Sequence, residues 1–329
     1  MIASNTALFQ SGIRQRSLRK HCRLGRATEL VFVLATGVML TIGGTAQAAD
    51  LDWDAGDPVG DSAVDGGDGD WDTTSTLWTL NGGLSTIAFT SGDTATFGAP
   101  GSYDVTLQEN ISVATITFET TDVTIAANTA QTLNVTGADI DVTGATDSAE
   151  IAAGIISAVN VTGAGDLTLS GDVAAVTVNQ VAATGSTTIS NAADSLIVTE
   201  GKAILSGSTA IIDTGSVTVN GGTLDVGANE TIGSLAGTGG NVALTGTLTV
   251  GGSDTTTYGG DMSGAGGLTL NSSGGTGQLT LSGTNTSTGT TTVTSGILAV
   301  NGSNAIGNTS DVTIAAAGTL NLLANETIG

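Results

Sequence analysis

The chain has 329 residues, a formal net charge of −23 and only seven Lys or Arg. Its single His and single Cys are His21 and Cys22, and Lys202 is its one cation beyond residue 26. Because the chain has no His or Cys after Cys22, that part of it excludes a Ser-His-Asp or Cys-His nucleophile and a His/Cys zinc site. So few cations also argue against nucleic acid as a partner, because phosphate binding needs clustered Lys and Arg.

Residues 1–48 have the pattern of an export signal. Six Lys or Arg precede residue 27, apolar residues run from Leu30 to Ile42, and Ala46-Gln47-Ala48 follows. A basic start, a short apolar core and an A-x-A site are typical of a secretory signal peptide. The alternative, a transmembrane anchor, needs about 20 apolar residues and this run is shorter. We therefore expect a signal peptide at 1–48 that is cleaved after Ala48.

Residues 49–100 are rich in Asp and contain three Trp. Gly66–Asp70 matches the first five positions of a calcium-binding β-roll nonapeptide, but Asp72 stands where that motif has an aliphatic residue. The favoured alternative is a solvated acidic cap in which Trp53, Trp71 and Trp78 cover the open end of an array. The acidic residues are Asp50, Asp52, Asp54, Asp57, Asp61, Asp65, Asp68, Asp70 and Asp72.

Short alternating segments dominate the rest of the chain, which has 50 Gly and only 3% aromatic residues. Apolar residues alternate with Thr, Ser, Asn or Asp, which predicts strands with one buried and one wet face. This alternation argues against disorder, the other state typical of such a composition. The segments are Val105–Leu107, Val113–Phe118, Val123–Ile125, Leu133–Val135, Ile140–Val142, Leu167–Leu169, Val176–Val178, Val217–Val219, Leu224–Val226, Val242–Val250, Leu268–Leu270, Leu279–Leu281, Leu298–Val300, Val312–Ile314 and Leu320–Leu322.

One stretch departs from this pattern. In Glu150–Val159 the apolar residues stand at 151, 155, 156 and 159, a spacing that predicts a helix. Elsewhere we expect about 15 to 20 strands of three to six residues, a number that suits either a sandwich or a coil of strands.

An internal repeat favours the coil. Asn-Glu-Thr-Ile-Gly occurs at 229–233 and at 325–329, an offset of 96 residues, and Ala210-Ile211 matches Ala305-Ile306 upstream. Fixed-period self-similarity is typical of an array whose units bury their apolar faces on one another. We predict an all-β, right-handed parallel β-helix with coils of about 20 to 25 residues, some 11 to 14 coils in all, the repeat spanning about four. Stacked Thr and Asn would form ladders outside, and Val, Ile and Leu a dry column inside.

Residues 279–298 read LTLSGTNTSTGTTTVTSGIL and follow Gly264-Ala265-Gly266-Gly267-Leu268-Thr269-Leu270. This segment resembles the passenger-associated transport repeat, a β-strand repeat of bacterial autotransporter passengers. Ser287 departs from the pattern, since the family usually has an aromatic residue after Asn-Thr. Residues 228–237 and the Trp-Asp region also resemble the family, and the whole resemblance covers 50–100 and 196–329.

The resemblance implies a passenger that crosses the inner membrane by its signal and reaches the Gram-negative cell surface beside a C-terminal β-barrel translocator. We expect that barrel beyond Gly329, because the second repeat copy stops there and the sequence reads as a piece of a longer protein. The resulting domains are a signal peptide at 1–48, a cap region at 49–100 and β-helix repeats at 101–329. The implied function is non-enzymatic, a stalk that serves adhesion to a host or cell-surface ligand.

Two further hypotheses stay open. An exported carbohydrate-active enzyme would need a groove with two carboxylates about 5 to 9.5 Å apart. Lys202 is the one candidate base for a lyase, although a solvated turn position is the simpler interpretation. A surface repeat protein with another C-terminal anchor is the third hypothesis. No catalytic, cofactor-binding or metal-ligating residue is assigned.

Overall fold

The computed structural model describes residues 32–33, 39–40, 48–56, 63–80, 85–180 and 184–328. The chain divides into two units, Met1–Gln47 and Ala48–Gly329. In the first, β1 (Phe32–Val33) and β2 (Met39–Leu40) pair antiparallel, and the rest of the expected signal segment before Ala48 lies outside the described residues. The part of the chain that the structure describes contains no helix capable of spanning a lipid bilayer.

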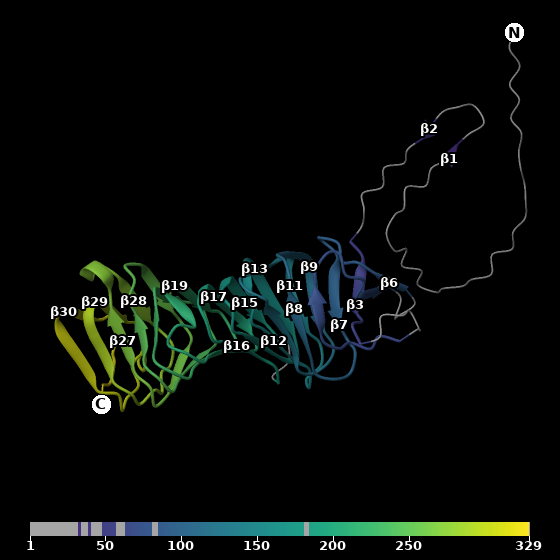
Figure 1. Ribbon diagram of the computed structural model, residues 1–329. Helices are drawn as coiled ribbons and strands as arrows, with labels where there is room; N and C mark the ends of the chain where they lie inside the picture. Colours follow the sequence, from purple (N-terminus) through teal and green to yellow (C-terminus); the bar gives the residue numbers. More distant parts are fainter. Residues whose placement is uncertain are drawn as a thin grey trace, which may run out of the picture. The chain divides into compact units, whose positions relative to one another are not determined.

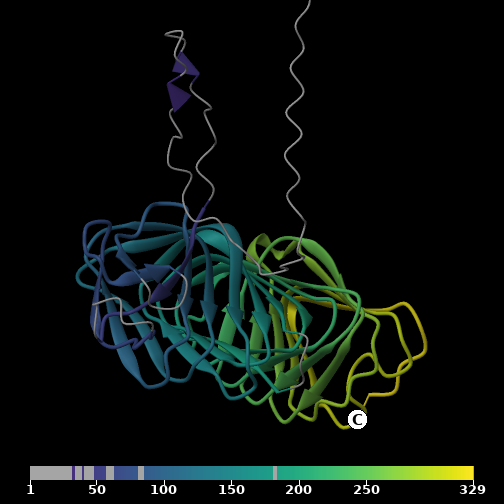
Figure 2. The same ribbon diagram turned by 90° about the vertical axis from the view of Figure 1, so that its right-hand side faces the viewer.

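The second unit is a parallel β-solenoid of about 11 coils (Figure 1). In the view turned by 90°, the strands of this unit follow one another from purple to yellow around one interior (Figure 2). A 3-10 turn covers Ser273–Gly275. The strands are β3 (Asp50–Trp53), β4 (Gly69–Trp71), β5 (Trp78–Leu80), β6 (Ser85–Ile87), β7 (Thr94–Phe97), β8 (Tyr103–Leu107), β9 (Ile111–Phe118), β10 (Val123–Ala127), β11 (Thr132–Val142), β12 (Ser148–Ile151), β13 (Gly154–Gly163), β14 (Asp166–Leu169), β15 (Val173–Asn179), β16 (Ser186–Ile189), β17 (Ala193–Glu200), β18 (Lys202–Leu205), β19 (Ile211–Val219), β20 (Thr223–Val226), β21 (Glu230–Ile232), β22 (Ser234–Ala236), β23 (Asn241–Leu244), β24 (Leu248–Val250), β25 (Thr255–Tyr258), β26 (Asp261–Gly264), β27 (Leu268–Asn271), β28 (Gln278–Leu281), β29 (Thr291–Val300) and β30 (Val312–Leu322).

Each coil stacks on the one before it in parallel register. A ten-stranded sheet runs from β4 to β26 and an eleven-stranded sheet from β6 to β22, with every second strand of the chain in the same sheet over most of their length. Coil length varies along the solenoid. Ala203 pairs with Thr187 in the preceding coil, whereas Ala149 pairs with Val123, which is much further back along the chain. The turns absorb this variation while the strands keep their register.

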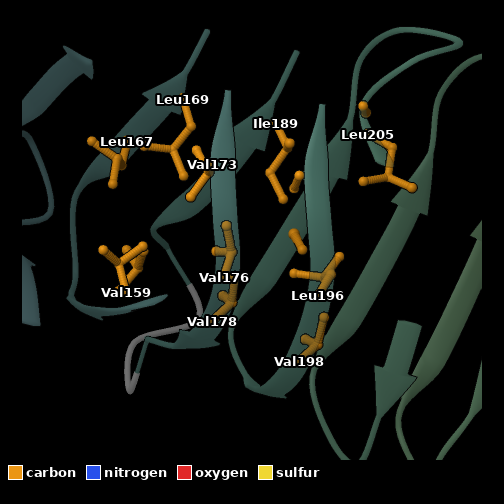
Figure 3. Close-up of a cluster of buried hydrophobic side chains, with 14 of the residues drawn as sticks. Val159, Leu167, Leu169, Val173, Val176, Val178, Ile189, Leu196, Val198 and Leu205 are labelled. Atoms are coloured by element: carbon orange, nitrogen blue, oxygen red, sulfur yellow. The ribbon is translucent and has the colours of Figure 1, made fainter. Parts of the chain in front are cut away.

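A dry aliphatic column fills the coil. Alternate residues of each strand point inward, so that Leu167 and Leu169 of β14 face Val176 and Val178 of β15 across the interior (Figure 3). Each of these four side chains is at most 1% exposed. Burial of apolar area at about 25 cal/mol per Å² is therefore distributed along the column, with no single globular centre.

Outward residues form the expected polar ladders. The Asn160 amide donates to Asp139 in the preceding coil at 3.1 Å, and the Thr162 hydroxyl donates to Asp141 at 3.1 Å. Toward the C-terminal end, five threonines occupy the same register position in successive coils. This threonine column consists of Thr231, Thr249, Thr269, Thr292 and Thr313.

The cross-section changes near residue 230. Up to β19 the long strands of the eleven-stranded sheet bend part-way, with register shifts at the bends. After β19 the bent strand divides into β21 and β22, and β21 opens a seven-stranded sheet that continues through β24 and β27. Three short strands, such as β20, β21 and β22, then complete one coil.

The structure confirms the all-β parallel coil and places every alternating segment named above in strands. The helix prediction for Glu150–Val159 is wrong, because β12 and β13 cover its two ends and Ile156 is 62% exposed. Ile151 lies in β12, whereas Ile155, Ile156 and Val159 lie in β13, after the turn at 152–153. Val242–Val250 forms two strands, β23 and β24, and the solenoid has more strands than the 15 to 20 expected.

The two copies of the repeat lie on different faces of the coil. Leu224 lies in the ten-stranded sheet, whereas its counterpart Leu320 pairs with Leu298 in the seven-stranded sheet. Four coils lead from Glu230 to Val312, so the 96-residue repeat spans slightly more than four coils, close to the expected number but not a whole one. What repeats is the sequence of strands and corners. Gly201 and its counterpart Gly296, with φ of +78° and +90°, both stand at a corner.

A core substitution should cost far more stability than its outward neighbour. We expect Leu196→Ala, at a fully buried site in β17, to lose about 2–5 kcal/mol of unfolding free energy. Ile197→Ala, one residue on and 39% exposed, should lose under about 1 kcal/mol. The urea midpoint by far-UV circular dichroism measures both, and equal losses would contradict a single inward face on β17.

Glycine at the repeat corner should resist substitution. At Gly201 an added Cβ would meet the Gln180 Cβ at 2.7 Å, whereas at Gly92, with φ of +91°, it would meet nothing within 4 Å. Gly92→Ala should lower the free energy of unfolding only by the cost of a non-glycine residue in the left-handed backbone region, about 1–2 kcal/mol. Gly201→Ala should lower it clearly more. Urea midpoints of the two variants decide this, and similar shifts would mean that the corner is not crowded.

Candidate functional site

An aromatic cluster fills the first coils of the solenoid. Trp78 lies 5.0 Å from Trp53, 5.0 Å from Trp71 and 5.1 Å from Phe89 between ring centroids, mostly tilted or edge-on. Phe97 stacks in turn on Phe118 at 5.3 Å in the following coil. The three tryptophans that the sequence singled out are at most 1% exposed, so the structure brings them together in the core.

Antiparallel pairing occurs at the N-terminal edge of the eleven-stranded sheet. β3 pairs with β5 and β5 with β6, against the parallel direction of the later ladders. A short antiparallel hairpin at an edge leaves few unpaired backbone groups for another chain to extend.

The Asp-rich region lines an open cleft of about 450 Å³ beside β4 and β8. Asp68 accepts a hydrogen bond from the Asp104 backbone N–H at 2.8 Å, and Asp70 accepts one from the Gln108 amide at 2.6 Å. Both carboxylates therefore hold neighbouring strands in place. Asp57 and Asp61 lie outside the described residues.

Asp72 organises the turn that follows β4. Its carboxylate accepts the backbone N–H of Thr74 at 2.7 Å and of Ser75 at 2.5 Å, and both hydroxyls donate to it as well. Partial burial works to raise the pKa of Asp72, but these hydrogen bonds outweigh it and lower the pKa below its usual value. Among the described residues, no group of three or more His, Cys, Asp or Glu is placed to share a metal ion.

Lys202 begins β18 and is not the turn residue expected from the sequence. Its ammonium lies 2.8 Å from the Asp225 carboxylate one coil further on, with the two side chains 44% and 26% exposed. An exposed pair of this kind contributes at most about 1 kcal/mol. Its geometry is that of a cross-strand ion pair.

The features that sequence reasoning missed are carboxylate clamps between coils, one of them fully buried. Glu230, 2% exposed, accepts backbone N–H groups of the preceding coil from Ala210 at 3.3 Å and Ile211 at 3.1 Å. Glu326 accepts the matching N–H groups of Ala305 and Ile306 at 2.9 and 3.2 Å. The repeat was the available signal, because Glu and its Ala-Ile partners recur together.

Asn285, in the segment that resembles the transport repeat, makes a related contact where no strand continues the ten-stranded sheet among the described residues. Its Oδ1 accepts the Met262 N–H at 2.7 Å, and its Nδ2 donates to the Ala305 carbonyl. One amide thus joins three consecutive coils. An Asn suits this position because it offers a donor and an acceptor at once.

Comparison with known proteins adds one similarity. A stretch of 52 residues, 15% of this chain, is 60% identical to part of the adhesin BmaC autotransporter of Brucella suis biovar 1 (strain 1330). That stretch makes up 2% of the adhesin, so the match spans a small part of the relative. No family model and no solved structure matches the chain. The similarity and the parallel solenoid together fit an autotransporter passenger.

The aromatic cluster should be a large single contribution to stability. We expect Trp78→Ala to lower the free energy of unfolding by about 3–5 kcal/mol, because it removes a buried ring that contacts several others. Trp78→Phe keeps a ring and should lose less than half as much. Thermal melts followed by tryptophan fluorescence measure both, and a negligible effect of Trp78→Ala would show that the cluster is not packed.

Proposed function

We propose that the chain is the stalk of an autotransporter passenger that is exported to the cell surface and serves adhesion without enzymatic activity. The observation that carries the proposal is the 60% identity over 52 residues to an autotransporter adhesin, in a chain that folds as one parallel coil. A coil of this kind extends in one direction by adding strands to an edge. Such a shape suits a spacer that carries a binding surface away from a membrane.

The same proposal assigns the segments. Residues 1–48 are the cleaved signal peptide, 49–100 the N-terminal cap and 101–329 passenger repeats, with a β-barrel translocator as the partner. The buried tryptophans and the antiparallel hairpin β5–β6 support the cap assignment. The backbone hydrogen bonds of Asp68 and Asp72 support a structural role for the acidic residues.

The competing function is a carbohydrate-active enzyme. It would need two carboxylates free to act on one glycosidic bond. In the acidic cleft, Asp68 and Asp70 each hold a neighbouring strand by a hydrogen bond. Because these two carboxylates are engaged in hydrogen bonds within the solenoid, the cleft favours the stalk function over the enzyme.

Export is tested with the natural full-length gene product in a Gram-negative host. We expect N-terminal sequencing of the surface protein to begin at Ala49, and protease added to intact cells to degrade the passenger. Ala48→Arg should block processing and leave the protein inside, since the site needs a small residue. An unprocessed wild-type protein that resists protease on intact cells would overturn the export claim.

Adhesion is tested separately with the same cells. Bacteria that display the protein should bind epithelial monolayers better than bacteria with an in-frame deletion of residues 49–328. Display of the remaining passenger, measured by antibody, is the control. Equal adherence at equal display would reject an adhesive role for this segment, and release of reducing sugar from surface glycans would favour the enzyme.

A further inference from the structure

Glu230 occupies an unusual position, a carboxylate buried at the point where the bent strand of the eleven-stranded sheet divides. It begins β21, the first strand of the seven-stranded sheet. Its two oxygens accept the N–H groups of Ala210 and Ile211, the entry to β19 in the preceding coil. These donors would otherwise be unpaired at a strand start, and an unpaired buried N–H costs about 1–3 kcal/mol.

No cation neutralises this carboxylate among the described strands that pack on it. β19 brings Asp213, whose negative charge acts against ionisation of Glu230, and β22 and β24 carry no titratable side chain. Asp225 of β20 is paired with Lys202. The two backbone N–H groups are therefore the contacts that stabilise the ionised carboxylate of Glu230. Burial and the negative charge of Asp213 destabilise it.

We propose that Glu230 is a proton-controlled clamp between two coils, which holds the junction of the three sheets tightly when neutral and loosens it when ionised. The neutral acid still accepts both N–H groups, strongly at its carbonyl oxygen and weakly at its hydroxyl oxygen, without placing a charge in the interior. The ionised form accepts both N–H groups but stays desolvated beside Asp213. Opening of the 210–230 junction gives the charged carboxylate access to water, so ionisation favours the open state.

The direction of the pH effect follows from this environment. Burial raises the pKa of Glu230 from 4.5 to about 7, while the Ile211 and Ala210 hydrogen bonds oppose the shift. A carboxyl whose folded pKa exceeds its unfolded value stabilises the closed state fully below the unfolded pKa. That stability is lost as pH rises from about 4.5 through about 7, so the junction is tighter in acid than at alkaline pH.

Hydrogen exchange of the Ala210 and Ile211 amides, corrected for the intrinsic rate at each pH, reads this opening directly. From pH 5 to pH 8 we expect the opening constant to rise roughly 50- to 100-fold in the wild-type protein. In the same protein, the ¹³C shift of the Glu230 carboxyl should titrate with a midpoint near 7. This second readout needs no variant.

Glu230→Gln should abolish the pH dependence of these two amides, because its side chain cannot ionise. Glu326→Gln makes the same substitution in the matching clamp at Ala305 and Ile306, so it is the matched control and should leave the Ala210 and Ile211 profile unchanged. A flat wild-type profile, a carboxyl midpoint near 4.5, or a pH dependence that persists in Glu230→Gln would each overturn the clamp.

Discussion

In-register stacking of parallel strands is the constraint on which the rest of this structure depends. A strand inside these sheets pairs with its equivalents one coil earlier and one coil later, so backbone hydrogen bonds and inward side chains repeat together. A one-residue slip would turn the aliphatic column outward and the polar ladders inward. This explains why coil length varies through the turns while the alternation within the strands is kept.

The sequence predicted the strands well because a period of two is a local property. Val105, Leu224 and Leu279 point inward as expected, each with no exposed surface. The helix prediction at Glu150–Val159 failed because two strand faces separated by a turn imitate helical spacing over a short stretch. The grouping of the strands into coils was also hard to predict from the sequence, because the turns that end the strands vary in length. Within Val242–Val250 the alternating pattern does not reveal the turn between two strands.

The repeat predicts local structure and not a fixed position around the coil. Its copies lie on different faces, yet Gly201 and Gly296 both form corners, and Glu230 and Glu326 both clamp an Ala-Ile pair. Local sequence therefore specifies corner, strand and clamp, while the face is set by the coils already stacked. The recurrence of Glu 20 or 21 residues after an Ala-Ile pair was visible in the sequence alone. Their contact needed the coil, because each Glu meets backbone groups that lie one full coil earlier in the chain.

The threonine column offers the most direct test of stacked coils. Nitroxide labels on cysteine variants at Thr231 paired in turn with Thr249, Thr269, Thr292 and Thr313, with Cys22→Ser, can be measured by electron paramagnetic resonance. The stacked coil predicts a mean separation that rises by about 4.8 Å per coil, to ~19 Å for the outermost pair across four coils. Separations that do not grow steadily with the number of coils would contradict the solenoid.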